Sequence, residues 1–254
     1  MTYYDDLTKD EKRVTVFKEA ISRKAHGITY DLGTGSGILA SFASKNAQKV
    51  YALEINPLVI KKYAAKLLEE YDNIEILEED ASSYEFKEKA DVIICEMLDT
   101  ALIDEEQVPV INNAIKYAKE DTVFIPESTY DTIQVGEAKL SYVTYQEFGN
   151  RTFNSLSSEI KYNEVNFSRK INPNFEKDIN LTIEKAGTIN CLLITTYTCV
   201  ADNLITEPTP MLNPPLLIPT NELQVSKGDT IIINLKYTMG GGLNTIRTNT
   251  KRVI

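Results

Sequence analysis

Three glycines stand at a spacing that suits close approach of a ligand to the main chain. They lie in the run Asp31-Leu32-Gly33-Thr34-Gly35-Ser36-Gly37-Ile38-Leu39, between a β-type segment and a helical one. Glycine permits a tight turn and has no Cβ to block the approach, and the first N–H groups of a helix are free to bind a ligand. The run therefore predicts a nucleotide-type binding turn.

The glycine spacing also separates the kinds of nucleotide. A dinucleotide fingerprint places its third glycine three residues after the second, and this chain has Ile38 at that position. The spacing disfavours an NAD or FAD site. It leaves a purely structural glycine turn as a minor alternative.

Two acidic residues follow at the ends of the next two β-type segments. Glu54 comes nineteen residues after Gly35, where a carboxylate can accept hydrogen bonds from both hydroxyls of a ribose. Asp80, followed by Ala81, ends the third segment, at the sheet edge where an adenine would lie. Either acid alone is typical of a solvated surface, but the pair after a glycine-rich turn predicts ribose and adenine contacts.

A further pair of carboxylates is spaced for the binding of a cation. Glu96 ends the fourth β-type segment and Glu105 follows nine residues later, so the two converge if the chain between them folds back as a hairpin. Converging carboxylates bind a planar guanidinium through charge-assisted hydrogen bonds that fix its orientation. The alternative is that residues 104–106 begin a solvated helix.

The elements that must position these residues form two groups. Up to residue 125, β-rich segments alternate with helical stretches, which predicts an α/β fold with a parallel sheet covered by helices. After Pro126 the pattern changes to alternating β-branched and aromatic residues, which predicts an all-β unit over 126–254. The expected strands are 27–32, 49–55, 73–78, 90–96, 122–125, 129–135, 191–200 and 230–237, and the expected helices are 8–22, one from Ser36 onward, and 56–71.

The glycine run, Glu54 and Asp80-Ala81 together resemble the nucleotide-binding motifs of the class I S-adenosylmethionine (SAM)-dependent methyltransferases. The resemblance implies a Rossmann-like sheet, SAM as the cofactor, and a place for Asp31 beside the methionine end of SAM. The expected cofactor-binding residues are Arg13, Asp31, Gly33, Gly35, Glu54, Asp80 and Ala81.

The Glu96 to Glu105 segment resembles the two-glutamate hairpin of the protein arginine methyltransferases. The run Lys9-Asp10-Glu11-Lys12-Arg13 looks like that family's N-terminal helix segment, which implies that Arg13 pairs with the cofactor carboxylate. A methyltransferase domain over 1–125 followed by a smaller β-barrel-like substrate domain over 126–254 matches the family's layout. The resemblance implies methyl transfer to a nitrogen, of a guanidinium or a similar group, held by Glu96 and Glu105 as catalytic residues.

The chain departs from that family around the acceptor. The family's Thr-His-Trp loop corresponds to residues 206–215, which contain neither His nor Trp, and the family's aromatic N-terminal motif is reduced to Tyr3-Tyr4. We therefore expect a short or missing lid. We also expect an acceptor pocket lined by the proline-rich loop Pro208 to Pro215, with Asn213, and flanked by Asp99.

These departures leave three hypotheses for the function. The acceptor is arginine in a peptide or protein, or it is a small nitrogenous metabolite. In the third hypothesis the chain is a non-catalytic SAM-binding interaction module.

Composition excludes several other kinds of site. His26 is the only histidine, so a Ser-His-Asp triad or a His-rich metal centre is excluded. The three cysteines show no CxxC spacing, which argues against a zinc site or a disulfide framework. No metal is expected.

Charge and hydropathy limit which partners and which cellular compartment we expect for the protein. Net charge is −10, and residues 1–125 hold 24 Asp and Glu against 15 Lys and Arg. This acidity argues against a nucleic-acid partner and favours a cationic acceptor. No apolar run approaches the ~20 residues of a membrane helix and the N-terminus is not a signal sequence, so we expect a cytoplasmic protein without a membrane partner.

A cluster of aromatic residues leaves the oligomeric state open. These side chains either pack on a second copy, giving a homodimer, or fill the barrel; they are Tyr142, Tyr145, Phe148 and Phe153.

Overall fold

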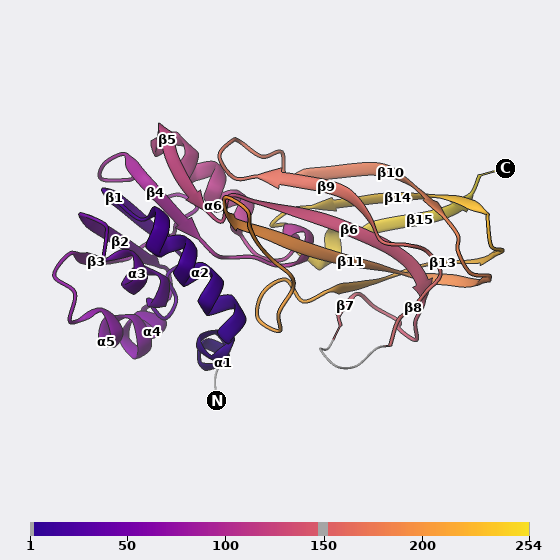
Figure 1. Ribbon diagram of the computed structural model, residues 1–254, viewed down its shortest axis with the longest axis horizontal. Coiled ribbons are helices and arrows are strands. Elements are labelled where there is room, and N and C mark those ends of the chain that lie inside the picture. The colour runs from indigo at the N-terminus through magenta and orange to yellow at the C-terminus, as the bar shows by residue number, and fades with distance from the viewer. Residues whose placement is uncertain (1–2, 147–151, 254) are drawn as a thin grey trace.

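The first half of the chain forms a five-stranded parallel sheet in the order β3-β2-β1-β4-β5 (Figure 1). The computed structural model describes residues 3–146 and 152–253. The strands are β1 (Ile28–Leu32), β2 (Lys49–Glu54), β3 (Ile74–Glu78), β4 (Ala90–Cys95) and β5 (Ala118–Ile125). The strand order reverses between β1 and β4, and ligands of open α/β sheets bind at the carboxyl ends of strands at such a point. The predicted Rossmann-like sheet is confirmed.

The helices differ from the predicted ones at their ends. They are α1 (Tyr3–Lys9), α2 (Glu11–Lys24), α3 (Ile38–Ala43), α4 (Pro57–Val59), α5 (Ala65–Leu68) and α6 (Gln107–Ala114), with a π-helical turn at Ile60–Ala64 and 3-10 turns at Thr100–Leu102, Ile115–Tyr117 and Leu243–Thr245. The single helix predicted over 8–22 is wrong, because Asp10 separates α1 from α2 and caps α2 by accepting the Arg13 N–H at 3.1 Å. The helix after the glycine run starts at Ile38, since Gly37 has a left-handed φ of 86°.

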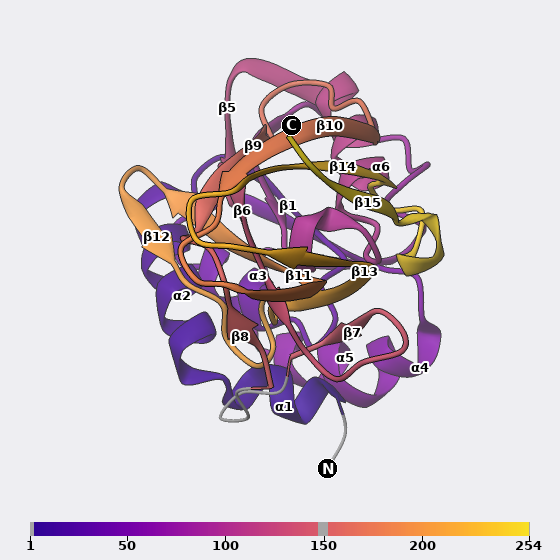
Figure 2. The same ribbon diagram turned by 90° about the vertical axis from the view of Figure 1, so that its right-hand side faces the viewer.

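The second half of the chain is antiparallel. Its strands are β6 (Ser128–Glu137), β7 (Thr144–Tyr145), β8 (Asn154–Ser155), β9 (Ile160–Asn166), β10 (Asn174–Thr182), β11 (Gly187–Ala201), β12 (Leu204–Thr206), β13 (Leu216–Val225), β14 (Thr230–Thr238) and β15 (Arg247–Arg252). Figure 2 shows the three-stranded sheet β10-β14-β15 on one side of β11 and β13, which belong to the larger sheet β7-β13-β11-β6-β8. The predicted barrel-like unit is therefore present.

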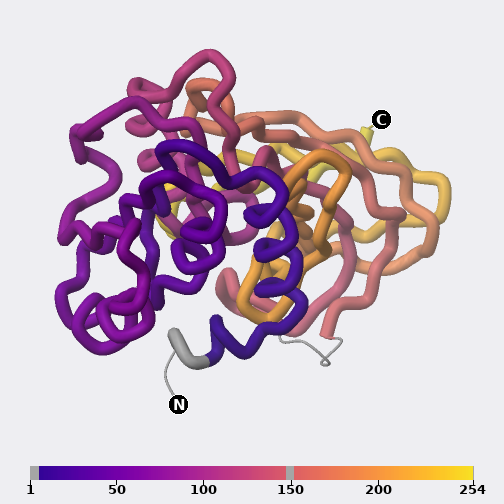
Figure 3. Tube along the Cα trace, turned by 60° about the vertical axis from the view of Figure 1, so that its left-hand side comes forward, coloured from indigo at the N-terminus to yellow at the C-terminus, as the bar shows by residue number. Residues whose placement is uncertain are grey.

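The two halves share one hydrophobic core that runs without a break from α2 to β14. The chain passes between them just after β5, where Glu127 donates its N–H to Cys199 O (2.9 Å) and accepts the Phe167 N–H (2.9 Å). Figure 3 shows the orange segment around β12 beside the indigo helix α2, and Lys24 of that helix pairs with Asp202 at 2.6 Å.

The aromatic segment proposed for dimerisation divides between surface and barrel. Tyr142 is 74% exposed, whereas the Tyr145 hydroxyl donates to Asp99 (3.3 Å) and Phe153 packs beside Ala138. Phe148 lies outside the described residues. None of the helices in the described part of the chain has the length and apolar character needed to cross a membrane.

Candidate active site

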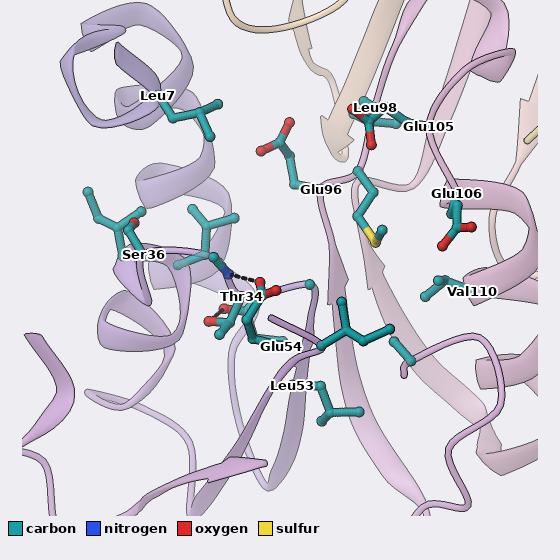
Figure 4. A pocket seen from close by; sticks show the side chains of 18 of the residues that line it. Leu7, Thr34, Ser36, Leu53, Glu54, Glu96, Leu98, Glu105, Glu106 and Val110 are labelled. Carbon is teal, nitrogen blue, oxygen red and sulfur yellow. Dashed lines mark hydrogen bonds between the residues drawn. The ribbon is translucent and has the colours of Figure 1, made fainter. Parts of the chain in front are cut away.

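A cavity of about 290 Å³ opens at the carboxyl ends of the parallel strands. Figure 4 shows Glu54 and Thr34 at one end of it and Glu96 and Glu105 at the other. Its walls include each residue predicted to hold the cofactor and both predicted catalytic glutamates, namely Arg13, Asp31, Gly33, Gly35, Glu54, Asp80, Ala81, Glu96 and Glu105. The structure therefore brings all nine together.

The glycine turn forms a cradle of main chain at one end of the cavity. Gly33 and Gly35 have φ values of 74° and 55°, which glycine adopts without strain. The Thr34 N–H donates to Leu53 O at 2.7 Å and fixes the turn to β2. A Cβ on Gly33 would lie 2.8 Å from the Met97 sulfur, so a side chain there would have to displace the Met97 thioether.

Two carboxylates are held rigidly beside this turn. Glu54, only 7% exposed, accepts the Gly35 N–H at 3.1 Å with Oε2 and the Asn56 N–H at 2.9 Å with Oε1. Asp80 accepts the Ser82 N–H at 2.8 Å. A carboxylate oxygen can accept a second hydrogen bond, so Glu54 and Asp80 fit a ribose and an adenine with their geometry already fixed.

Asp31 lies fully buried between the glycine turn and the glutamates. The Thr34 hydroxyl donates to it at 2.5 Å, and burial raises the pKa of its carboxyl to about 6. An acid in such a place gains most from a cationic ligand, which supplies the partner that water no longer provides.

The hairpin that carries the two glutamates is held from inside by Asp99. This carboxylate accepts the N–H groups of Ile103 (3.2 Å), Asp104 (2.9 Å) and Glu105 (3.2 Å). At the tip of the hairpin Ala101 and Leu102 are left-handed, each with φ of 58°.

The barrel holds the same hairpin from outside. The Ala101 N–H donates to the Thr196 hydroxyl at 2.8 Å, and the Thr100 hydroxyl donates to Pro214 O at 2.7 Å. Leu102 O accepts the Gly240 N–H at 2.8 Å. The unusual backbone of the tip is therefore fixed by hydrogen bonds to residues of the second half.

The structure corrects two predicted acceptor residues. Asp99 is 5% exposed and is outside the cavity wall, because its oxygens bind the amides of its own hairpin. Asn213 is 1% exposed and donates to the Thr198 hydroxyl at 2.8 Å, inside the barrel. Met211 is the residue of the proline-rich loop that lines the cavity.

Arg13 makes a contact that the sequence did not predict. Its guanidinium forms an ion pair with Glu96, and the two side chains are only 5% and 6% exposed. Burial raises the pKa of Glu96, and the Arg13 charge opposes that rise. Burial also raises the pKa of Glu105, with the charges of Asp104 and Glu96 acting in the same direction.

Several wall residues carried no sequence signal. Leu7 lines the cavity from α1, so the short N-terminal segment reaches the site, where a short or missing lid was expected. Met97 and Glu106 line it as well. Asp10 accepts hydrogen bonds from the Thr209 hydroxyl and the Met211 N–H, which joins the start of α2 to the proline-rich loop.

Comparisons with known proteins place this site in a family. The domain family described as a methyltransferase domain matches residues 30–121, the part of the chain that contains the glycine turn, both strand-end acids and the hairpin. Residues 30–121 are therefore a methyltransferase domain, and the protein is a SAM-dependent methyltransferase. This result favours an enzyme over a non-catalytic binding module.

Relatives of this methyltransferase cover different shares of the chain. It is 44% identical to an uncharacterised protein of Methanocaldococcus jannaschii (97% of this chain, 96% of the relative) and 40% identical to one of Methanothermobacter thermautotrophicus (97% and 96%). It is 28% identical to protein arginine N-methyltransferase 6 of Danio rerio over 47% of this chain and 35% of the relative.

One solved structure shares the fold over nearly the whole chain. It is a chain of the Trypanosoma brucei PRMT1 enzyme-prozyme heterotetrameric complex with AdoHcy, with a TM-score of 0.77, 16% identity, and coverage of 97% of this chain and 96% of that one. This methyltransferase thus has the fold of a protein arginine methyltransferase, including the barrel-like second half.

The cradle at Gly33 provides a test of cofactor binding in this methyltransferase. Gly33→Ala is expected to lower SAM affinity about tenfold or more, because the added Cβ meets the Met97 sulfur and the left-handed backbone costs about 1–3 kcal/mol. Gly228→Ala is the matched control, since its φ is 93° and nothing lies within 4 Å of its Cβ. Titration calorimetry with SAM should show the loss in the first variant alone. Equal affinities for the two variants would contradict the assignment of the cradle.

The buried acid Asp31 predicts a pH dependence of the same binding step. We expect the ionised carboxyl to attract the cofactor ammonium, and its pKa of about 6 means that this attraction is present above pH 6 and is lost as the pH falls below it. SAM affinity should then drop by up to about tenfold per pH unit through this single group. Asp31→Asn should bind weakly, with a flatter profile between pH 5 and pH 8. Parallel profiles for the two proteins would show that Asp31 does not contact the ammonium.

Proposed function

We propose that this methyltransferase transfers a methyl group from SAM to a guanidinium nitrogen of arginine in a peptide or protein. The observation that carries the proposal is the ion pair of Glu96, a buried acid of the cavity wall, with the guanidinium of Arg13. The site thus already contains a carboxylate in contact with the chemical group that the proposed acceptor presents. Glu105 lines the same cavity and supplies a second carboxylate.

The residues present suit the chemistry that bound SAM supplies, which is an electrophilic methyl group on a sulfonium. Gly33, Gly35, Glu54 and Asp80 would hold its nucleoside, and Asp31 and Arg13 its amino acid end. For this the Arg13 guanidinium would exchange Glu96 for the cofactor carboxylate, which would free Glu96 for the acceptor. An arginine guanidinium stays protonated near neutral pH, so Glu96 and Glu105 would orient and polarise it rather than deprotonate it in advance. The proton leaves during or after transfer. Productive transfer needs the nitrogen about 3–3.5 Å from the methyl carbon, which is the geometry the hairpin would enforce.

A small nitrogenous metabolite is the second candidate acceptor. It is supported by the proline-rich loop, where the Thr209 hydroxyl is bonded to Asp10 and the wall contains Met211 in place of an aromatic side chain. A wall of this kind has few groups that would recognise an extended peptide. Glu96 and Glu105 would still bind the cationic end of a metabolite.

Incubation of the protein with methyl-labelled SAM and size-fractionated native extract tests the acceptor. Label in protein fractions, recovered as methylarginine after hydrolysis, is the expected result. Label confined to fractions below about a kilodalton would refute the peptide version and support the metabolite. Label on nucleic acid would refute both, and the net charge of −10 argues against it.

We also propose that the protein forms a homodimer. Leu58 and Tyr142 are each 74% exposed, so both large apolar side chains are available for contact with a second copy. Light scattering after size exclusion should give twice the mass of 28.6 kDa. A single-chain mass at micromolar concentration would contradict the proposal.

A further inference from the structure

Gln107, the first residue of α6, is fully buried and bonds the two peptide groups on either side of Glu96. Its Nε2 donates to Cys95 O at 2.8 Å, and its Oε1 accepts the Met97 N–H at 2.9 Å. The Cys95 thiol also lies 3.3 Å from the same Oε1. One side chain therefore fixes the main chain before and after the candidate catalytic glutamate.

These two bonds have the pattern of a parallel strand. In a parallel ladder, a residue opposite Glu96 would donate its N–H to Cys95 O and accept the Met97 N–H with its carbonyl. The carboxamide of Gln107 makes both bonds without being part of a strand. It takes the place of a main-chain residue at the edge of β4.

The sheet leaves that place empty because the chain turns away into the barrel. The register of β4 with β5 pairs Ile94 with Ile125, so a continued β5 would put Glu127 opposite Glu96. Glu127 instead donates its N–H to Cys199 O and accepts the Phe167 N–H, both in the second half. Without a substitute, the Cys95 carbonyl and the Met97 N–H would be buried and unpaired, which is costly in a protein interior.

We propose that Gln107 is a positioning residue for Glu96, which it holds by extending β4 one residue beyond its last partner strand. The inference rests on the proposed role of Glu96 in binding the acceptor. Gln107 itself does not line the cavity, so its effect on transfer passes through the main chain of residues 95–97.

Gln107→Met tests the contact directly, because methionine has a similar length and no hydrogen-bonding amide. Hydrogen exchange at the Met97 N–H is expected to accelerate by about tenfold or more, since a local opening no longer breaks a hydrogen bond. Asn112→Leu is the matched control on the same helix. Its carboxamide donates to Ile171 O (2.9 Å) and accepts the Ile171 N–H (2.8 Å), away from the cavity. Unchanged exchange at Met97 in Gln107→Met would overturn the proposal.

A kinetic comparison separates positioning from general stability. With a peptide that contains a single arginine as the probe, Gln107→Met should lower kcat roughly 10–100-fold, the size of effect that misplacement by about 1 Å produces, and leave SAM affinity within about twofold. Asn112→Leu should lose similar thermal stability and keep kcat. If Gln107→Met keeps kcat while Glu96→Gln loses it, the positioning role is wrong and the proposed function stands. If the unmodified protein does not methylate the peptide, the arginine proposal fails and exchange at Met97 alone decides the role of Gln107.

Discussion

Replacing Glu96 by glutamine is expected to lower the rate of methyl transfer by about 10³-fold or more while SAM still binds. Glutamine keeps the shape of the side chain and removes the negative charge that would hold a cationic acceptor. A thousandfold loss corresponds to about 4 kcal/mol of activation free energy, which is the range measured for the removal of one preorganised electrostatic contact. The measurement is single-turnover transfer from labelled SAM to a peptide with one arginine, beside calorimetry with SAM.

Two controls make the result specific. Glu106→Gln removes the same charge from the same cavity wall and is expected to change the rate far less, because Glu106 is not one of the two acids that match the hairpin motif. Thermal unfolding of Glu96→Gln should also be recorded, since Arg13 then loses its buried carboxylate partner. A variant that transfers the methyl group at the normal rate would exclude Glu96 from the acceptor site.

Glu54→Ala is expected to weaken SAM binding by about 10²-fold or more. Two charge-assisted hydrogen bonds to the ribose hydroxyls would be lost, each worth about 1.5–3 kcal/mol. The variant also leaves the N–H groups of Gly35 and Asn56 without their acceptor, which loosens the turn that must cradle the cofactor.

Glu78→Ala is the matched control for this variant. Glu78 ends β3 directly opposite Glu54 in the sheet register, and its side chain is exposed and outside the cavity wall. Calorimetry should show near-normal SAM affinity for Glu78→Ala and a large loss for Glu54→Ala. Equal affinities for the two variants would mean that Glu54 does not bind the ribose.

The sequence predicted features that depend on local pattern. β-rich segments alternating with helices indicated the parallel sheet, and because parallel strands end at one edge, the acids at the ends of β2, β3 and β4 could be expected in a single cavity. The prediction that Glu105 lies in the same cavity rested on the resemblance to a known motif. Periodicity alone also allowed a solvated helix start at that position.

Features that depend on long-range contacts escaped prediction. Asp99 was expected in the acceptor pocket because it lies between the two glutamates in sequence, yet in the structure it binds the amides of its own hairpin. Asn213 was expected beside it, but the loop turns this side chain into the barrel. Gln107 carried no signal at all, because its function arises only from the departure of β5 after Ile125. No local pattern encodes where a distant strand stops.

The left-handed tip of the hairpin restricts how this catalytic unit can be combined with other proteins. Ala101 and Leu102 belong to the half of the chain that contains the cofactor turn, but their main chain is bonded to Thr196 and Gly240 of the other half. A methyltransferase sheet grafted with residues 96–105 alone would gain the two glutamates without the bonds that give them their places. A chimaera of two methyltransferases would therefore have to take the hairpin and the barrel from the same parent. For the same reason, we expect the sequences of the two halves to change together during evolution.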